Sequence, residues 1–211
     1  MKITKFDQSC VLLEKNGRCL LIDPVEISTQ IPVIENIDAI IITHKHSDHY
    51  QPEVLDKFKL SNQDARIYVA EDMIDEIRQP AEVALIDNDI QVGEFNLRFF
   101  GKDHAPIVDN ISPCNNIGVI IDGAIVNPGD SFVNPFVSNP DVLFVAISAP
   151  WLRIDEVMKY VSLMSPKNVI PVHDGLLSPL GHKISDNWVK KACDDIGAVY
   201  TPMNPGETII L

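Results

Sequence analysis

The sequence has few basic residues and no long apolar run. It contains 17 Lys and Arg against 30 Asp and Glu, which gives a formal net charge of −13. Most nucleic-acid affinity comes from Lys and Arg that neutralise phosphates, so this balance argues against nucleic acid or an anionic membrane surface as a partner. No stretch approaches the ~18 apolar residues of a transmembrane helix, and the first residues lack the pattern of a secretory signal. We therefore expect a soluble, cytoplasmic protein.

Cysteine is also scarce, with four residues and no C-x-x-C spacing. The Asn16-Gly17 dipeptide predicts a two-residue hairpin turn, which places Glu14 opposite Cys19. In that register Cys10 and Cys19 are four residues out of step, or roughly 13 Å apart, beyond the reach of a disulfide. Reduced cysteines fit the expected cytoplasmic location.

Hydrophobic residues, by contrast, make up 45% of the chain and are spread evenly along it. This content excludes intrinsic disorder, which requires low hydrophobicity together with strong charge. A length of 211 residues fits one layered domain with a sizeable core. We therefore predict a single domain over residues 1–211, and we leave open whether it forms a homo-oligomer.

Short apolar runs bounded by polar or turn residues predict strands, and the two segments 36–43 and 139–146 resemble each other. The runs lie at 10–14, 18–23, 38–42, 66–70, 92–93, 95–100, 117–122, 124–126, 141–147 and 168–172, and Asp122-Gly123 is a second hairpin signal. Two apolar stripes at helical spacing predict helices over 154–161 and 184–196, the second capped by Ser185 or Asp186. The order of these elements, with a faint internal duplication, predicts an α/β (α+β) fold. We expect a four-layer αβ/βα sandwich.

The strongest motif is Thr43-His44-Lys45-His46-Ser47-Asp48-His49, directly after a predicted strand. Shuffling the residues produces H-x-H-x-D-H in roughly a few of every ten thousand sequences, so chance explains it poorly. In an extended segment His44 and His46 point to the same side and can bind one cation. Asp48 and His49 follow a turn, and a carboxylate with an imidazole suits a second cation. This loop predicts half of a dinuclear metal site.

Three further candidate ligands, His104, Asp130 and His173, each follow another predicted strand. Alone, each would be an ordinary turn or interior residue. Beside the first motif they become candidate ligands, because a tetrahedral site is incomplete without more His or Asp side chains. His182 follows no strand, and we predict that it lies on the surface or at the rim of a pocket.

The motif and the strand-end residues after it, in this order, resemble the metallo-β-lactamase-fold superfamily of metallohydrolases. The resemblance covers nearly the whole chain and implies the metallo-β-lactamase fold. It implies that His44, His46 and His104 bind a first metal, that Asp48, His49 and His173 bind a second, and that Asp130 bridges the two. It also makes Asp23 and Asp103 candidates to orient ligand imidazoles through their second N–H, with an ordinary turn role as the alternative.

Within this superfamily the chain is most similar to compact cytoplasmic members that include ascorbate-6-phosphate lactonase. Asp130 stands where true β-lactamases have a cysteine, and His104 lacks the Gly-His-Thr context of glyoxalase II-like members. The short chain leaves no room for the extra domain of the nuclease branch. His46 stands where flavodiiron proteins usually carry Glu, which argues against an oxygen-reducing di-iron site.

We therefore predict a metal-dependent hydrolase in which Asp48 and Asp130 take part in catalysis. Two divalent ions, zinc in the first place with manganese or iron as alternatives, would share a hydroxide that attacks a small lactone, ester or phosphoester. Two ions outweigh the two carboxylates and the hydroxide by one positive charge, which favours an anionic substrate. The leaving-group acid stays open among Tyr50, His182 and Asp130. The alternatives are a non-hydrolytic metal protein, either a mononuclear iron dioxygenase or a binding scaffold, and a nuclease, which the charge disfavours.

Overall fold

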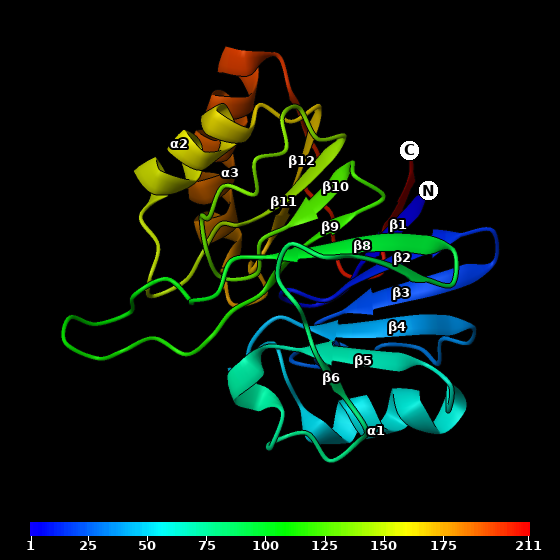
Figure 1. The fold of residues 1–211 in the computed structure, drawn as a ribbon. Coiled ribbons are helices and arrows are strands. Elements are labelled where there is room, and N and C mark those ends of the chain that lie inside the picture. The colour runs from blue at the N-terminus through cyan, green and yellow to red at the C-terminus, as the bar shows by residue number, and fades with distance from the viewer.

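The computed structural model describes residues 1–211 and contains two seven-stranded mixed sheets with helices on their outer faces (Figure 1). The larger of two hydrophobic clusters lies between the sheets, where Ile40 of one sheet and Phe144 of the other are both fully buried. Apolar residues on the inner faces hold the sheets together because their removal from water is favourable. This arrangement confirms the predicted four-layer αβ/βα sandwich.

The first sheet has the strand order β14-β1-β2-β3-β4-β5-β6. Its strands are β1 (Lys2–Lys5), β2 (Val11–Lys15), β3 (Arg18–Ile22), β4 (Ile37–Ile42), β5 (Arg66–Val69), β6 (Glu82–Val83) and β14 (Thr208–Ile210). The predicted hairpin is present, with Glu14 opposite Cys19 and Lys15 opposite Arg18. Asn16 and Gly17 both have positive φ, as the two-residue turn requires. All four cysteines are free.

The second sheet has the order β7-β8-β9-β10-β11-β12-β13. Its strands are β7 (Asp89–Val92), β8 (Phe95–Phe100), β9 (Gly118–Ile121), β10 (Ile125–Asn127), β11 (Val142–Ala146), β12 (Asn168–Val172) and β13 (Val199–Tyr200). In both sheets the first four strands pair antiparallel, and the remaining strands continue in parallel. The matching segments 36–43 and 139–146 contain the equivalent strands β4 and β11. The predicted correspondence between the two halves is therefore visible in the topology.

Helices cover each sheet on its outer side. Helix α1 (Pro52–Ser61) follows β4 and buries Val54, Leu55 and Phe58 in the large cluster, and the short 3-10 helix η1 (Glu71–Met73) follows β5. Helix α2 (Ile154–Met164) follows β11 and packs beside α3 (Pro179–Ile196) over the second sheet, where a separate hydrophobic cluster lies beneath them (Figure 1). No helix is long and apolar enough to span a membrane.

Helix α3 differs from its prediction in both its start and its buried face. It begins after Ser178, whose hydroxyl accepts a hydrogen bond from the Gly181 amide, and not at Ser185 or Asp186. Pro179 fits the first helical position because its missing N–H would have no partner there. The predicted buried stripe was Ile184, Trp188, Ala192 and Ile196, and its second half is correct, since Ala192 is buried and Ile196 is partly buried against the second cluster. Ile184 and Trp188 are 54% and 48% exposed, and Val189 and Cys193 are buried instead.

Candidate metal centre

The loop after β4 is anchored by a buried aspartate from the end of β3. Asp23 accepts hydrogen bonds from the amide of Thr43 at 2.7 Å and from its hydroxyl at 2.7 Å, and all three groups are buried. Its second oxygen also lies 2.8 Å from Nδ1 of His49. Asp23 therefore fixes the start of the loop and orients one of its imidazoles.

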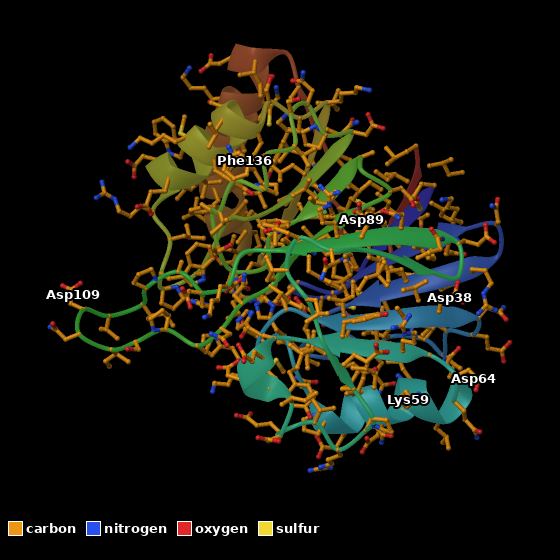
Figure 2. The ribbon with its side chains drawn as sticks, viewed as in Figure 1. Asp38, Lys59, Asp64, Asp89, Asp109 and Phe136 are labelled. Atoms are coloured by element: carbon orange, nitrogen blue, oxygen red, sulfur yellow. The ribbon has the colours of Figure 1, made fainter.

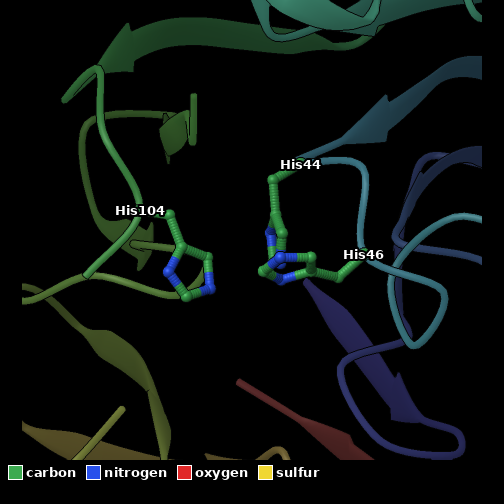
Figure 3. Close-up of side chains that lie close together, drawn as sticks. All are labelled: His44, His46 and His104. Carbon is green, nitrogen blue, oxygen red and sulfur yellow. The ribbon is translucent and has the colours of Figure 1, made fainter. Parts of the chain in front are cut away.

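The structure brings together the triplets that the resemblance implies. In the first triplet, His44, His46 and His104, and in the second, Asp48, His49 and His173, one potential ligand atom per residue lies within 4.8 Å of the others. The same holds for His44, His49 and Asp130, a group that shares one histidine with each triplet. Figure 3 shows the imidazole of His104, from the loop after β8, facing those of His44 and His46, from the loop after β4. Seven side chains from four strand ends thus form one continuous cluster that can accommodate two ions.

Three buried ring nitrogens in this cluster have no hydrogen-bond partner. They are the Nε2 atoms of His44, His49 and His104. The Nδ1 atoms of the same residues are engaged by the hydroxyl of Thr43, by Asp23 and by the carbonyl of Ala105. Buried polar groups in proteins are nearly always satisfied, and metal-binding histidines use one nitrogen for the ion and the other for an orienting partner. The residues present therefore fit a bound metal.

Asp130 lies at the centre of the cluster. Its Oδ2 is 3.4 Å from Nε2 of His104 and 3.2 Å from Nε2 of His173, and its Oδ1 is 3.3 Å from Nε2 of His49. The indole Nε1 of Trp151 donates a hydrogen bond of 2.7 Å to the same Oδ2. Asp130 thus reaches both triplets while a second side chain holds its carboxylate in place.

The turn before Asp130 depends on a glycine. Gly129 has φ of 60°, and a Cβ at this position would lie 2.3 Å from Oδ1 of Asn116 and 3.0 Å from Cβ of Thr43. That amide oxygen of Asn116 accepts the backbone N–H of Asp130 at 2.9 Å. Any larger residue at position 129 would push the aspartate away from the cluster.

Gln8, in the loop after β1, ties two members of the second triplet together. Its side-chain amide donates to Oδ2 of Asp48 at 3.0 Å, and its backbone carbonyl accepts the amide of His173 at 2.8 Å. Its side-chain oxygen also accepts the amide of Gly175 at 3.0 Å. Gln8 and His173 both adopt positive φ. Their strained backbones are held by these mutual contacts.

The imidazoles of the cluster differ in pKa, because some are surrounded by other histidines and some lie against carboxylates. Burial and the neighbouring histidines hold the pKa of His44 well below its ordinary value, so this imidazole is neutral, the form that binds metals. Burial alone would lower the pKa of His173, but hydrogen bonds to Asp130 and Asp48 raise that pKa to about 9. The pKa of His49 is also raised, by Asp130 foremost. Asp48 and Asp130 thus favour a positive charge, a proton or a metal ion, beside His49 and His173.

The cluster opens onto a cavity of about 540 Å³. One part of its wall consists of polar residues, and the rest is largely apolar. The lining residues are His46, Ser47, Asp48, Ile107, Asp130, Ser148, Ala149, Pro150, Trp151, His173 and Leu176. A small molecule in this cavity can therefore touch the candidate metal ligands directly.

Several residues considered from the sequence lie outside the cluster. Asp103 is exposed, makes no side-chain hydrogen bond to an imidazole and pairs with Asn115 in an isolated antiparallel bridge, so it neither orients a ligand nor lies in a turn. The hydroxyl of Tyr50 donates to the carbonyl of Glu76 at 3.4 Å, away from the cavity, and His182 lies on α3 outside the cavity wall. Of the three candidates for the leaving-group acid, Asp130 is the one that lines the cavity.

Comparison with known proteins establishes the family of the chain. A family model described as a Beta-lactamase superfamily domain matches residues 2–173. The chain belongs to the β-lactamase superfamily. Protein Rv0786c of Mycobacterium tuberculosis is 28% identical over 184 residues, which cover 85% of this chain and 86% of that protein. The matched region of the superfamily model includes all seven candidate ligands.

Two solved structures have the same fold. The metallo-beta-lactamase fold protein YhfI from Bacillus subtilis has a TM-score of 0.72 at 18% identity, over 99% of this chain and 98% of that one. Igni18, a novel metallo hydrolase from the archaeon Ignicoccus hospitalis, has a TM-score of 0.71 at 21% identity, over 99% and 97%. The predicted metallo-β-lactamase fold is thereby confirmed. The finer similarity to ascorbate-6-phosphate lactonase stays a prediction.

Sequence reasoning missed Gln8 and Trp151. No spacing rule marks an amide or an indole as a partner of an aspartate that lies 40 or 21 residues away. One signal was available for Trp151, which follows the predicted strand 141–147, as the ligands follow theirs. Gln8 precedes the first predicted strand, and its position after β1 became visible only in the structure.

Proposed function

We propose that the protein is a metal-dependent hydrolase with two divalent ions in the cluster described above. The observation that carries this proposal is a cluster of three buried, unpartnered histidine nitrogens with two carboxylates, Asp48 and Asp130, that line an open cavity. His44, His46 and His104 would hold one ion, Asp48, His49 and His173 the other, and Asp130 both. Histidine and aspartate ligands suit zinc first, with manganese or iron as alternatives.

When bound, two such ions polarise the oxygen of a substrate and lower the pKa of a water molecule so that it can attack a carbonyl or phosphoryl centre. The chain's own residues arrange the ligands for this chemistry. Asp23 holds His49 by Nδ1 and leaves its Nε2 directed at Asp130, and the indole of Trp151 fixes the Asp130 carboxylate. Gln8 keeps Asp48 beside His173. Preorganised ligands need not be reoriented during the reaction.

The reacting group we favour is a lactone, ester or phosphoester. Two divalent ions exceed the charge of Asp48 and Asp130, so the polar end of the cavity is positive when loaded and stabilises negative charge that develops on a substrate oxygen. A nuclease is disfavoured, because the net charge is −13 and no Lys or Arg lines the cavity.

The decisive experiment is a hydrolase screen with defined metal content. Purified protein is stripped with a chelator, reloaded with zinc, manganese or iron(II), and assayed on lactones, carboxylic esters, thioesters and phosphoesters. We expect turnover of at least one class with at least one ion and none in the stripped protein. Inactivity of all three loaded forms would contradict the proposal and favour a non-hydrolytic metal protein.

A pair of matched variants ties any activity to the cluster. Asp48→Ala removes a candidate ligand, and we expect it to lose the second ion and most of the turnover while circular dichroism stays unchanged, because the residue lies in a loop. Asp64→Ala removes the same side chain from an exposed turn before β5, and it should retain both ions and full turnover. Equal activity of the two variants would place the reaction elsewhere.

A further inference from the structure

The cavity has an apolar wall next to the candidate ligands. This apolar wall is formed by Ile107, Ala149, Pro150, Trp151 and Leu176. Ala149, Pro150 and Trp151 follow β11 in one short segment, Ile107 comes from the loop after β8, and Leu176 follows β12. Three separate parts of the chain thus place apolar groups beside the polar cluster.

No basic side chain reaches this wall. Lys45, in the metal-binding loop, lies 3.3 Å from Asp72 and 3.6 Å from Glu76, and Lys102 lines a different hollow. The charged side chains at the cavity, apart from histidines, are the two carboxylates of Asp48 and Asp130. A negatively charged group on a ligand, placed against this wall and away from the ions, would therefore lose water of hydration in part and find no cationic side chain as a partner.

Two side chains of the apolar wall are partly exposed to solvent. Leu176 is 72% exposed and Ile107 is 46% exposed. Ile107 belongs to the extended loop whose tip carries Asp109 in Figure 2, and Val108 and Ile111 of the same loop are 54% and 65% exposed. An apolar group that covers these side chains gains free energy in proportion to the area removed from water.

We infer that the part of the substrate that is not attacked is an uncharged apolar group, a short alkyl chain or an aromatic ring, which lies against Ile107, Pro150, Trp151 and Leu176. This inference rests on the proposed hydrolase function of the same cavity. The sequence favours an anionic substrate. This inference restricts negative charge to the reacting group beside the ions and makes the rest of the substrate uncharged. Trp151 has two roles here, since its ring faces the ligand and its Nε1 holds Asp130.

Binding of hydroxamates tests the inference without any turnover, because the hydroxamate group binds divalent ions and its tail then lies along the wall. The probes are straight-chain alkyl hydroxamates of increasing length and the mono-hydroxamate of adipic acid, titrated calorimetrically into zinc-loaded protein. Each added methylene should lower Kd about two- to fourfold. The adipic probe, with its terminal carboxylate, should bind at least about tenfold more weakly than hexanohydroxamate. Equal or tighter binding of the adipic probe would overturn the inference.

Exposed positions allow a matched charge test. Leu176→Lys places a cation at the apolar wall and should improve the Kd of the adipic probe about two- to fivefold while weakening that of hexanohydroxamate. Leu180→Lys makes the same charge change on α3, outside the cavity, and should alter neither value. Ile107→Lys provides a second variant at the wall if Leu176→Lys does not fold. Identical effects at positions 176 and 180 would contradict the assignment of this wall.

Turnover separates this inference from the proposed function. The p-nitrophenyl ester of hexanoic acid and the corresponding mono-ester of adipic acid are compared on the same zinc-loaded protein. Hydroxamates that follow the expected order, with neither ester cleaved, would support the apolar wall and count against hydrolysis of esters. Cleavage of both esters with the same kcat/KM would support the hydrolase and overturn the apolar preference.

Discussion

The two halves of the molecule have the same strand order and different chemistry at their strand ends. Strand β4 leads into a loop with four candidate ligands, whereas its counterpart β11 (Figure 1) leads into Ser148 and then into Ala149, Pro150 and Trp151 of the apolar wall. One half thus concentrates its ligands in a single loop. The other half supplies ligands one at a time, from the ends of β8, β10 and β12.

The strands that match these ligand-bearing strands have supporting roles. Asp23 after β3 corresponds in topology to Asp130 after β10, and His49 lies between the two carboxylates, with Nδ1 toward Asp23 and Nε2 toward Asp130. Gln8 after β1 corresponds in the same way to His104 after β8. The comparison teaches that a duplicated scaffold can use equivalent positions either to bind an ion or to orient the residue that does.

The largest effect should come from Asp130. Asp130→Asn keeps the shape of the side chain but removes the charge that both triplets face, and we expect turnover to fall more than about a hundredfold, beyond the loss typical of a supporting residue. Zinc content by mass spectrometry should fall below two ions per chain. Asp64→Asn, in an exposed turn, serves as the control, and comparable values for the two variants would refute the central position of Asp130.

The equivalent substitution in the other half, Asp23→Asn, should impair zinc binding less than Asp130→Asn does. Asp23→Asn keeps a side chain that tolerates the positive φ of 46° at this position, yet it weakens the orientation of His49. We expect zinc affinity, measured by competition with a chelator, to fall about tenfold to a hundredfold. If Asp23→Asn lost as much bound zinc as Asp130→Asn, Asp23 would not be a residue that only orients a ligand.

A smaller effect is expected for Trp151. Trp151→Phe retains an aromatic ring in the wall and removes the 2.7 Å hydrogen bond to Asp130, so zinc affinity should fall up to about tenfold. Trp188→Phe, at a half-exposed site on α3, is the matched control and should leave zinc affinity unchanged. If both variants bind zinc like the wild type, the hydrogen bond from Trp151 to Asp130 does not support metal binding, and Trp151 contributes to the apolar wall only.

The smallest effect concerns the helices that cover the two sheets. The 3-10 helix η1 follows β5 in the first half, and the 18-residue α3 takes the corresponding place after β12. Ser178→Ala removes the N-cap of α3 and should lower the free energy of unfolding by about 1 kcal/mol in urea titrations. Ser185→Ala, inside the helix, should change it by less than about 0.5 kcal/mol. The opposite ranking would place the helix start where the sequence pattern predicted it.

Local patterns in the sequence predicted the central strands, the hairpin register and the first ligand loop, because each depends on neighbouring residues. The short edge strands β6, β13 and β14, together with β1 and helix α1, were not predicted. His104, Asp130 and His173 were predicted from their place after apolar strands together with the family resemblance. Gln8 and Trp151 were not, since their contacts with Asp48 and Asp130 depend on how distant loops meet at one edge of the two sheets. The apolar wall was missed for the same reason, because three separate segments form it.

The count of bound ions tests the account most directly. Chain stripped of metal, dialysed against zinc and freed of excess ion should contain two zinc ions per molecule by mass spectrometry, and Asp48→Ala should contain one. Absence of stoichiometric zinc, manganese or iron after reconstitution of the folded wild-type chain would contradict a metal centre in this cluster, and with it the proposed hydrolase.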